Sequence, residues 1–198
     1  MRWWMRARAV LPGLAALALA WTVGLAFQER FFAFPTVFGT RAPVPTSLLA
    51  VTVGLILINH GLDRSRTSVE LTANRPVRMW DAAWTAATAL VSVGAGLTAA
   101  VTGNPEGLLM ARAVVAGLGG YLIARLVLRT DLASLAPLAV LTANIVLWDV
   151  QTFPESGPWL LSDPDNAVAW GASVLLLVVG LAGLTSRVQR VHRSADVP

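Results

Sequence analysis

The sequence predicts an all-α membrane protein that crosses the bilayer six times, with both ends of the chain in the cytoplasm. Hydrophobic residues make up 56% of its 198 positions and charged residues only 13%, which leaves too little polar surface for a soluble monomer. A helix needs about 20 apolar residues to cross about 30 Å of hydrocarbon. The chain offers six stretches of roughly this kind, at about 9–27, 46–59, 82–101, 108–128, 132–150 and 167–184.

The distribution of arginine predicts the orientation, because short cytoplasmic loops are enriched in basic residues. Basic residues gather before the first stretch, between the second and third, and around the ends of the fourth and sixth: Arg2, Arg6, Arg8, Arg64, Arg66, Arg75, Arg78, Arg125, Arg129, Arg187, Arg190 and Arg193. The alternate gaps hold only Arg30 and Arg41 as basic residues, beside several acidic ones. Because the chain also lacks lysine and is rich in alanine and arginine, we expect a multi-pass protein of a bacterial cytoplasmic (inner) membrane.

The predicted organisation is one membrane domain with short basic ends. The domain covers 9–186, between a basic interfacial head at 1–8 and a basic cytoplasmic tail at 187–198, and it includes a cytoplasmic loop at 61–80. The first stretch also has the basic start and apolar centre of a secretory signal, but its length favours retention as a helix. Since the arginines form separate clusters rather than one face, we expect contact with anionic lipid headgroups and not with nucleic acid.

The sequence gives no support for enzymatic chemistry. There is no cysteine, and the two histidines lie far apart, which disfavours a zinc site and thiol chemistry. No Gly-x-Ser-x-Gly elbow is present, and the absence of lysine rules out the phosphate-binding loop Gly-x-x-x-x-Gly-Lys-Ser/Thr. We therefore expect no catalytic residue, cofactor or metal in this chain. If ATP drives the protein, another chain supplies the ATPase.

Polar residues inside the predicted spans are candidates for a site, since each costs about 2.5–3.5 kcal/mol at mid-bilayer unless it is paired. Arg112 lies about one turn inside the fourth span and Asp149 lies near the end of the fifth, at a similar depth, so we predict that they pair. Such a pair either locks two helices together or lines an outward-facing pathway, which Asn144 would extend. The remaining alternative is that each side chain reaches outward to the headgroups.

The two longer outer loops are predicted to lack long regular helices. Residues 28–45 combine several phenylalanines with prolines, and we expect them at the outer leaflet as a lipid-facing belt or as a substrate gate. Residues 151–166 place the apolar segment 159–161 between prolines and acidic residues. This loop is predicted to dip into the interface as a partial re-entrant turn.

The inner loop at 61–80 is the most distinctive segment of the sequence. Thr67 followed by Glu70 fits a capping box, which would begin a short helix on the cytoplasmic surface. The arginines of this loop either hold phospholipid or present Val69 and Leu71 to a groove on a soluble partner.

This plan of six spans, a short basic inner helix and a proline-broken last outer loop resembles the permease half of ABC-2-type exporters. In that family, the inner loop between the second and third spans docks on the ATPase. The resemblance implies that this chain is the membrane-spanning permease subunit of a two-component ABC exporter and forms a homodimer or heterodimer around the transport path. It also implies contact with the ATPase at Val69, Glu70, Leu71 and Arg75. The alternative function is that of a non-transporting accessory or immunity-type membrane protein.

The inner loop also resembles the first motif of intramembrane polyprenyl-type prenyltransferases, which reads Asn-Asp-x-x-Asp-x-x-x-Asp and is followed by Asn-Arg-Pro. Asn59, Asp63 and residues 74–76 match this motif, whereas His60 and Thr67 replace two of its acids. Those acids would supply oxygen ligands to magnesium. This resemblance implies a degenerate prenyltransferase-like protein as the third interpretation.

Overall fold

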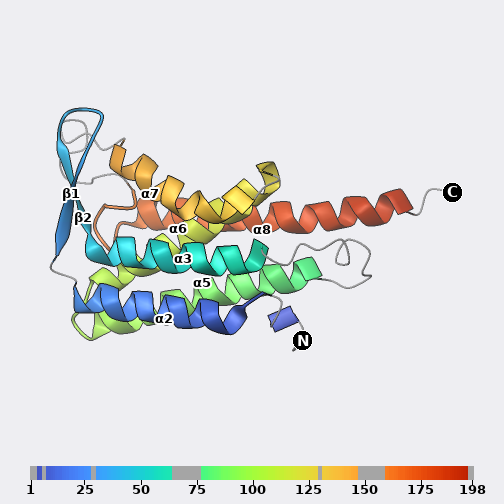
Figure 1. The fold of residues 1–198 in the computed structure, drawn as a ribbon, viewed down its shortest axis with the longest axis horizontal. Helices are drawn as coiled ribbons and strands as arrows, with labels where there is room; N and C mark the ends of the chain where they lie inside the picture. Colours follow the sequence, from blue (N-terminus) through green and yellow to red (C-terminus); the bar gives the residue numbers. More distant parts are fainter. Residues whose placement is uncertain are drawn as a thin grey trace.

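The helices of this protein run side by side in a bundle that carries a small β hairpin at one end (Figure 1). The computed structural model describes residues 4–5, 8–27, 30–63, 77–128, 131–146 and 159–195, without the side chains of residues 78, 131 and 186–195. The elements in chain order are α2 (Val10–Ala26), β1 (Phe31–Pro35), β2 (Arg41–Pro45), α3 (Thr46–Asp63), α5 (Val77–Val101), α6 (Glu106–Val127), the 3-10 helix η1 (Asp131–Leu135), α7 (Ala136–Val146) and α8 (Ala167–Ala195).

Four of the described helices, α3, α5, α6 and α8, are long and apolar enough to cross a membrane. The helix α2 and the helical stretch Leu132–Val146 are apolar but shorter. The prediction of a mostly helical fold is therefore confirmed, and the four apolar helices are compatible with a membrane protein. Six spans, and termini in the cytoplasm, stay predictions.

The apolar stretches of the sequence locate the helices but not all of their ends. α2 and α6 agree closely with the first and fourth predicted spans, whereas α3 continues to Asp63 and α5 begins at Val77. Helix therefore extends from both sides into the predicted loop at 61–80. α8 likewise continues to Ala195, inside the predicted basic tail, and the fifth predicted span divides into η1 and α7. Positions 147–150 of that span lie outside the described residues.

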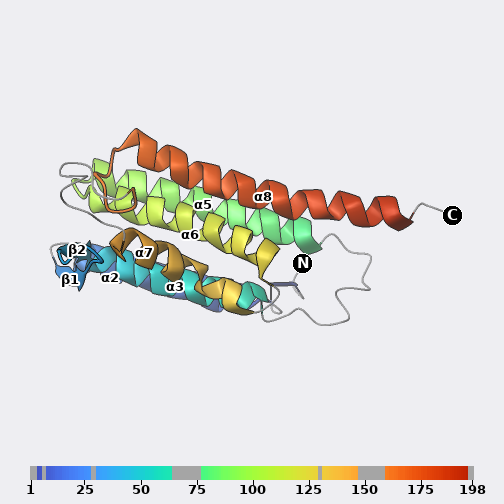
Figure 2. The ribbon, with the colours of Figure 1, turned by 90° about the horizontal axis from the view of Figure 1, so that it is seen from above.

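The helices form two layers that meet at α6. Figure 2 shows α5, α6 and α8 on one side and α2, α3 and α7 on the other. α6 packs against α5 and α8 within its own layer and against α3 and α7 across the boundary between the layers, which we call the seam. The end of the bundle where α3 ends and α5 begins is called the loop end, and α8 projects beyond it (Figure 1). The opposite end carries the hairpin and is called the hairpin end.

Residues 31–45 form an antiparallel β hairpin, which the all-α prediction misses. β1 pairs with β2 from Phe31↔Pro45 to Pro35↔Arg41. The prolines of this segment keep it out of a helix, and side chains on alternate positions of β2 point to one face. The two on the inner face, Ala42 and Val44, are fully buried. The hairpin therefore covers the end of the bundle, and its strands run across the helix axes in Figure 1.

The turn of this hairpin gives a clean test of backbone geometry. Gly39 has a φ of 76°, in the left-handed region, and nothing would contact a Cβ atom placed on it. Gly39→Ala is therefore expected to destabilise the protein by about 1 kcal/mol through backbone strain alone. The matched control is Gly171→Ala in the helix α8, where a Cβ also meets open space and where a gain of about 0.5–1 kcal/mol is expected. Denaturant unfolding in detergent micelles measures the change in stability of both variants. Changes of the same sign would contradict the left-handed conformation of Gly39.

Candidate functional site

Four charged side chains are buried together at the loop end of the bundle. Arg8 precedes α2, Asp63 ends α3, Asp81 lies near the start of α5 and Arg125 lies in the last turn of α6. Their side chains are between 2% and 8% exposed. Two guanidinium groups and two carboxylates give a formal charge of zero, and burial of charges is tolerated only when they are paired in this way. We call these four residues the ion cluster.

Asp81 is the centre of the ion cluster. Arg8 Nε lies 3.3 Å from Asp81 Oδ1, and Arg8 Nη2 donates to Oδ2 at 3.3 Å. Arg125 donates to the same Oδ2 from both terminal nitrogens, each at 3.2 Å. The indole N–H of Trp4 donates to Oδ1 at 3.1 Å, and its ring packs edge-on against two tryptophans of α5. Because charge-assisted hydrogen bonds are stronger than neutral ones, this carboxylate holds the N-terminal segment and α6 against α5.

The chain turns sharply between Arg8 and α2. Ala9 has φ 46° and ψ 42°, a left-handed conformation that costs an alanine roughly 1–2 kcal/mol. Arg8 donates to the carbonyl oxygen of Leu62, and its own carbonyl oxygen would lie 2.7 Å from a Cβ atom on Gly61. This close approach, together with the ion pair to Asp81, holds the turn at Ala9 in place.

Arg125 joins the end of α3 to the start of α5. Its Nε lies 3.6 Å from Oδ1 of Asp63, while its terminal nitrogens bind Asp81. Asp63 Oδ1 also accepts a 3.0 Å hydrogen bond from the hydroxyl of Tyr121, one turn before Arg125 on α6. The Tyr121 ring faces the guanidinium at 5.9 Å. The Arg125 guanidinium therefore links the end of α3 to the start of α5, the two helices that residues 64–76 connect in the sequence.

The ion cluster is built to link helices, because each of its charges faces an opposite one. The prenyltransferase interpretation requires Asn59 and Asp63 to belong to an open magnesium site. Asp63 is instead bound by Tyr121 and Arg125, and Asn59 is completely buried. Within the part of the chain that the structure describes, no group of three or more His, Cys, Asp or Glu residues is placed to hold a metal ion.

A second buried arginine lies at the hairpin end. Arg112 is 0% exposed although it carries a full charge. Its guanidinium donates to three backbone carbonyl oxygens of the turn at 159–163, those of Leu160, Ser162 and Asp163. The described part of the segment predicted as a re-entrant turn, 159–166, therefore binds this side chain through its backbone. Asp149, the predicted partner of Arg112, lies outside the described residues, so that pairing stays a prediction.

Asn144 fastens the same turn from α7. Its Oδ1 accepts the backbone N–H of Leu160 at 3.1 Å, and its Nδ2 donates to the carbonyl oxygen of Val140 at 2.9 Å. The sequence interpretation places Asn144 in the lining of a pathway beside Arg112. In the structure, both side chains hold the turn at 159–163, and we call the two residues the turn anchor.

Sequence reasoning did not single out the ion cluster. Arg8 and Arg125 entered only the comparison of basic residues between loops, and Asp63 entered only a partial motif. The sequence does contain a pattern that could predict this cluster. Asp63 and Asp81 are acidic residues at the arginine-rich ends of two apolar stretches, where a buried carboxylate needs a cation. Outside the described residues lie the predicted docking positions Val69, Glu70, Leu71 and Arg75.

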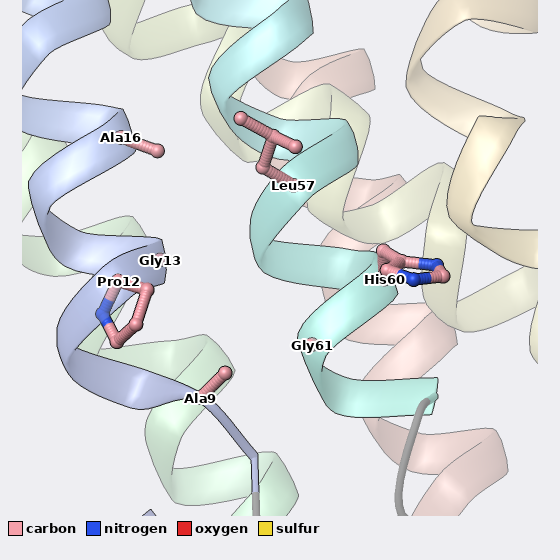
Figure 3. Close-up of a pocket in the computed structure, with 7 residues that line it drawn as sticks. All are labelled: Ala9, Pro12, Gly13, Ala16, Leu57, His60 and Gly61. Carbon is pink, nitrogen blue, oxygen red and sulfur yellow. The ribbon is translucent and has the colours of Figure 1, made fainter.

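A groove of about 190 Å³ lies between α2 and α3 near the loop end (Figure 3). Its lining is mostly apolar and consists of Ala9, Pro12, Gly13, Ala16, Leu57, His60 and Gly61. His60 is exposed, and its ring points away from α2 in Figure 3. The groove therefore lacks the convergent polar groups that fix a small ligand in a specific site.

Comparison with known proteins gives no match: no protein-family model, no curated protein and no solved structure matches this chain. The function therefore has to be inferred from the apolar helices, the ion cluster and the turn anchor.

Proposed function

We propose that this chain is the membrane-spanning permease subunit of a two-component ABC exporter, energised by a separate ATPase chain. The observation that supports this proposal is the bridge that Arg125 makes between Asp63 and Asp81. In the sequence, residues 64–76, which include the predicted docking positions, follow directly after the first of these carboxylates and precede the helix α5 that carries the second. A partner bound to this segment would therefore act on α3 and α5 together and, through Arg125, on α6.

In this proposal, the loop end faces the cytoplasm of a bacterial cell and the hairpin end faces outward. The arginines of the loop end that lie outside the ion cluster contact anionic headgroups, in keeping with the enrichment of basic residues on the cytoplasmic side. Two copies, or two related chains, enclose the transport path. Closure of the ATPases moves the segment 64–76 and shifts the helices against one another, so that this chain provides alternating access and performs no chemistry.

The proposal predicts that an ABC ATPase stays bound when the tagged protein is purified from its native membrane in mild detergent. Mass spectrometry of the purified material identifies the bound chains. The double substitution Glu70→Arg with Arg75→Glu reverses two charges in the predicted docking helix. It is expected to lower the amount of bound ATPase by about tenfold or more, because like charges placed across an interface cost several kcal/mol.

The matched control reverses one acid and one arginine at the other end of the protein. Asp165→Arg with Arg41→Glu changes two exposed side chains at the hairpin end and is expected to leave the bound ATPase unchanged. If the unaltered protein retains no ATPase, the exporter proposal fails. The non-transporting accessory or immunity-type membrane protein then becomes the better interpretation.

A further inference from the structure

We infer that two separate sets of polar contacts, which we call fastenings, hold the two helix layers together at the seam. One fastening is the ion cluster at the loop end and the other is the turn anchor at the hairpin end. Each controls the opening of the seam at its own end. The inference rests on the proposed function in taking movement of the two layers at the seam as the helix shift that gives alternating access. It assigns Arg125 and Arg112, both on the central helix α6, as the positioning residues of the two ends.

The ion cluster crosses the seam at two places. Arg125 on α6 reaches Asp63 at the end of α3, in the other layer. Arg8, which precedes α2 in that other layer, reaches Asp81 on α5. Because a buried charge is strongly disfavoured without its partner, separation of the layers at this end has to break both contacts together.

The turn anchor crosses the seam through the turn at 159–163. Arg112 on α6 binds backbone carbonyl oxygens of this turn, and Asn144 on α7 binds the backbone N–H of Leu160. The turn is thus bonded to both layers. Its release from either side chain removes this polar link between the layers at the hairpin end and leaves the apolar contacts there in place.

Between the two fastenings, apolar contacts fill the seam. Leu55 of α3 and Pro137 of α7 both pack against Gly117 of α6, and the surrounding side chains belong to one hydrophobic core. Apolar contacts are non-directional, whereas hydrogen bonds weaken steeply as their geometry degrades. Arg112 and Arg125 are about 20 Å apart along α6, at 1.5 Å per residue. At this separation the two fastenings are expected to act independently.

Single cysteines can report on each end, because the chain contains none of its own. Ser47 is 0% exposed and lies where Gly24 of α2 and Met110 of α6 meet the first turn of α3, toward the hairpin end. Ser134 is 4% exposed and lies in η1, which packs against both α3 and α6 at the loop end. Ser47→Cys and Ser134→Cys each replace a hydroxyl by a thiol. A charged maleimide reaches these thiols only when the seam opens to water, so its labelling rate in detergent micelles measures local opening.

The two arginine substitutions are expected to act at opposite ends. Arg125→Gln should raise the labelling rate of the cysteine at position 134 by about tenfold or more. The same substitution should change the rate at position 47 by less than about twofold. Arg112→Gln should give the reverse pattern. Equal acceleration at both positions, or no acceleration at either, overturns the inference.

Two further variants keep the test decisive if a glutamine variant does not fold, as judged by gel filtration. Arg125→Lys and Arg112→Lys keep the charge but lack the planar fork of donors, so they should give the same two-ended pattern with smaller changes. No ATPase takes part in the labelling. A two-ended pattern in a protein that captures no ATPase would therefore support the fastenings and refute the exporter proposal.

Discussion

Replacing Asp81 with asparagine is expected to lower the free energy of unfolding by about 3–5 kcal/mol, the size of effect seen when one partner of a buried ion pair is removed. Asp81 is 1% exposed, and its carboxylate accepts hydrogen bonds from Arg8, Arg125 and Trp4. Asparagine has nearly the same shape, so the substitution removes charge rather than volume. Asp63 then remains as the one carboxylate of the ion cluster, against two guanidinium groups.

Denaturant unfolding in detergent micelles, followed by tryptophan fluorescence, measures this loss. Asp165→Asn serves as the control, since it makes the same change at an exposed position and should alter stability by less than about 0.5 kcal/mol. The double variant Asp81→Asn with Arg125→Met restores a charge balance and should recover part of the loss. A loss of less than about 1 kcal/mol for Asp81→Asn would show that Arg8 and Arg125 do not depend on this carboxylate for compensation.

The helix ends at the ion cluster show what hydropathy cannot predict. α6 agrees with its predicted span because a long apolar stretch with few charges defines both of its ends. Hydropathy predicts that the second span ends at Asn59, because polar residues follow it. It predicts that the third span begins at Ala82, because polar residues precede it. In the structure, helix continues through Asp63 and begins before Asp81, since these carboxylates are neutralised by Arg125 of α6 and by Arg8, which precedes α2. Hydropathy is averaged over neighbouring residues, so it carries no information on pairing between residues that are distant in the sequence.

The hairpin was missed for a related reason. Its prolines correctly excluded a long helix, but strand formation depends on the pairing of Phe31–Pro35 with Arg41–Pro45 and on the turn that Gly39 closes. The alternation of buried and exposed positions in β2 becomes visible only once the end of the bundle is there to cover its inner face. The turn at 159–163 could be predicted as a break in helix from its sequence, but not as the acceptor of Arg112.

Arg112→Leu is expected to detach this turn from the bundle. Three backbone carbonyl oxygens lose their donor, at about 1 kcal/mol or more each, which gives a loss of about 3 kcal/mol in the stability of the turn. This corresponds to about a hundredfold larger population of the opened turn. Hydrogen exchange of peptides covering 159–166 measures this opening, while peptides around Asp81 should exchange as before.

Asn144→Leu separates the contribution of the other half of the turn anchor. It removes one acceptor, that of the Leu160 N–H, and should destabilise the turn by only about 1 kcal/mol. An unchanged rate of hydrogen exchange at 159–166 in Arg112→Leu would mean that the hydrogen bonds of this guanidinium do not stabilise the turn. A larger effect for Asn144→Leu than for Arg112→Leu would place the main attachment on α7. The predicted ordering, with Arg112 first, follows from three bonds made by a buried cation against a single bond made by a neutral amide.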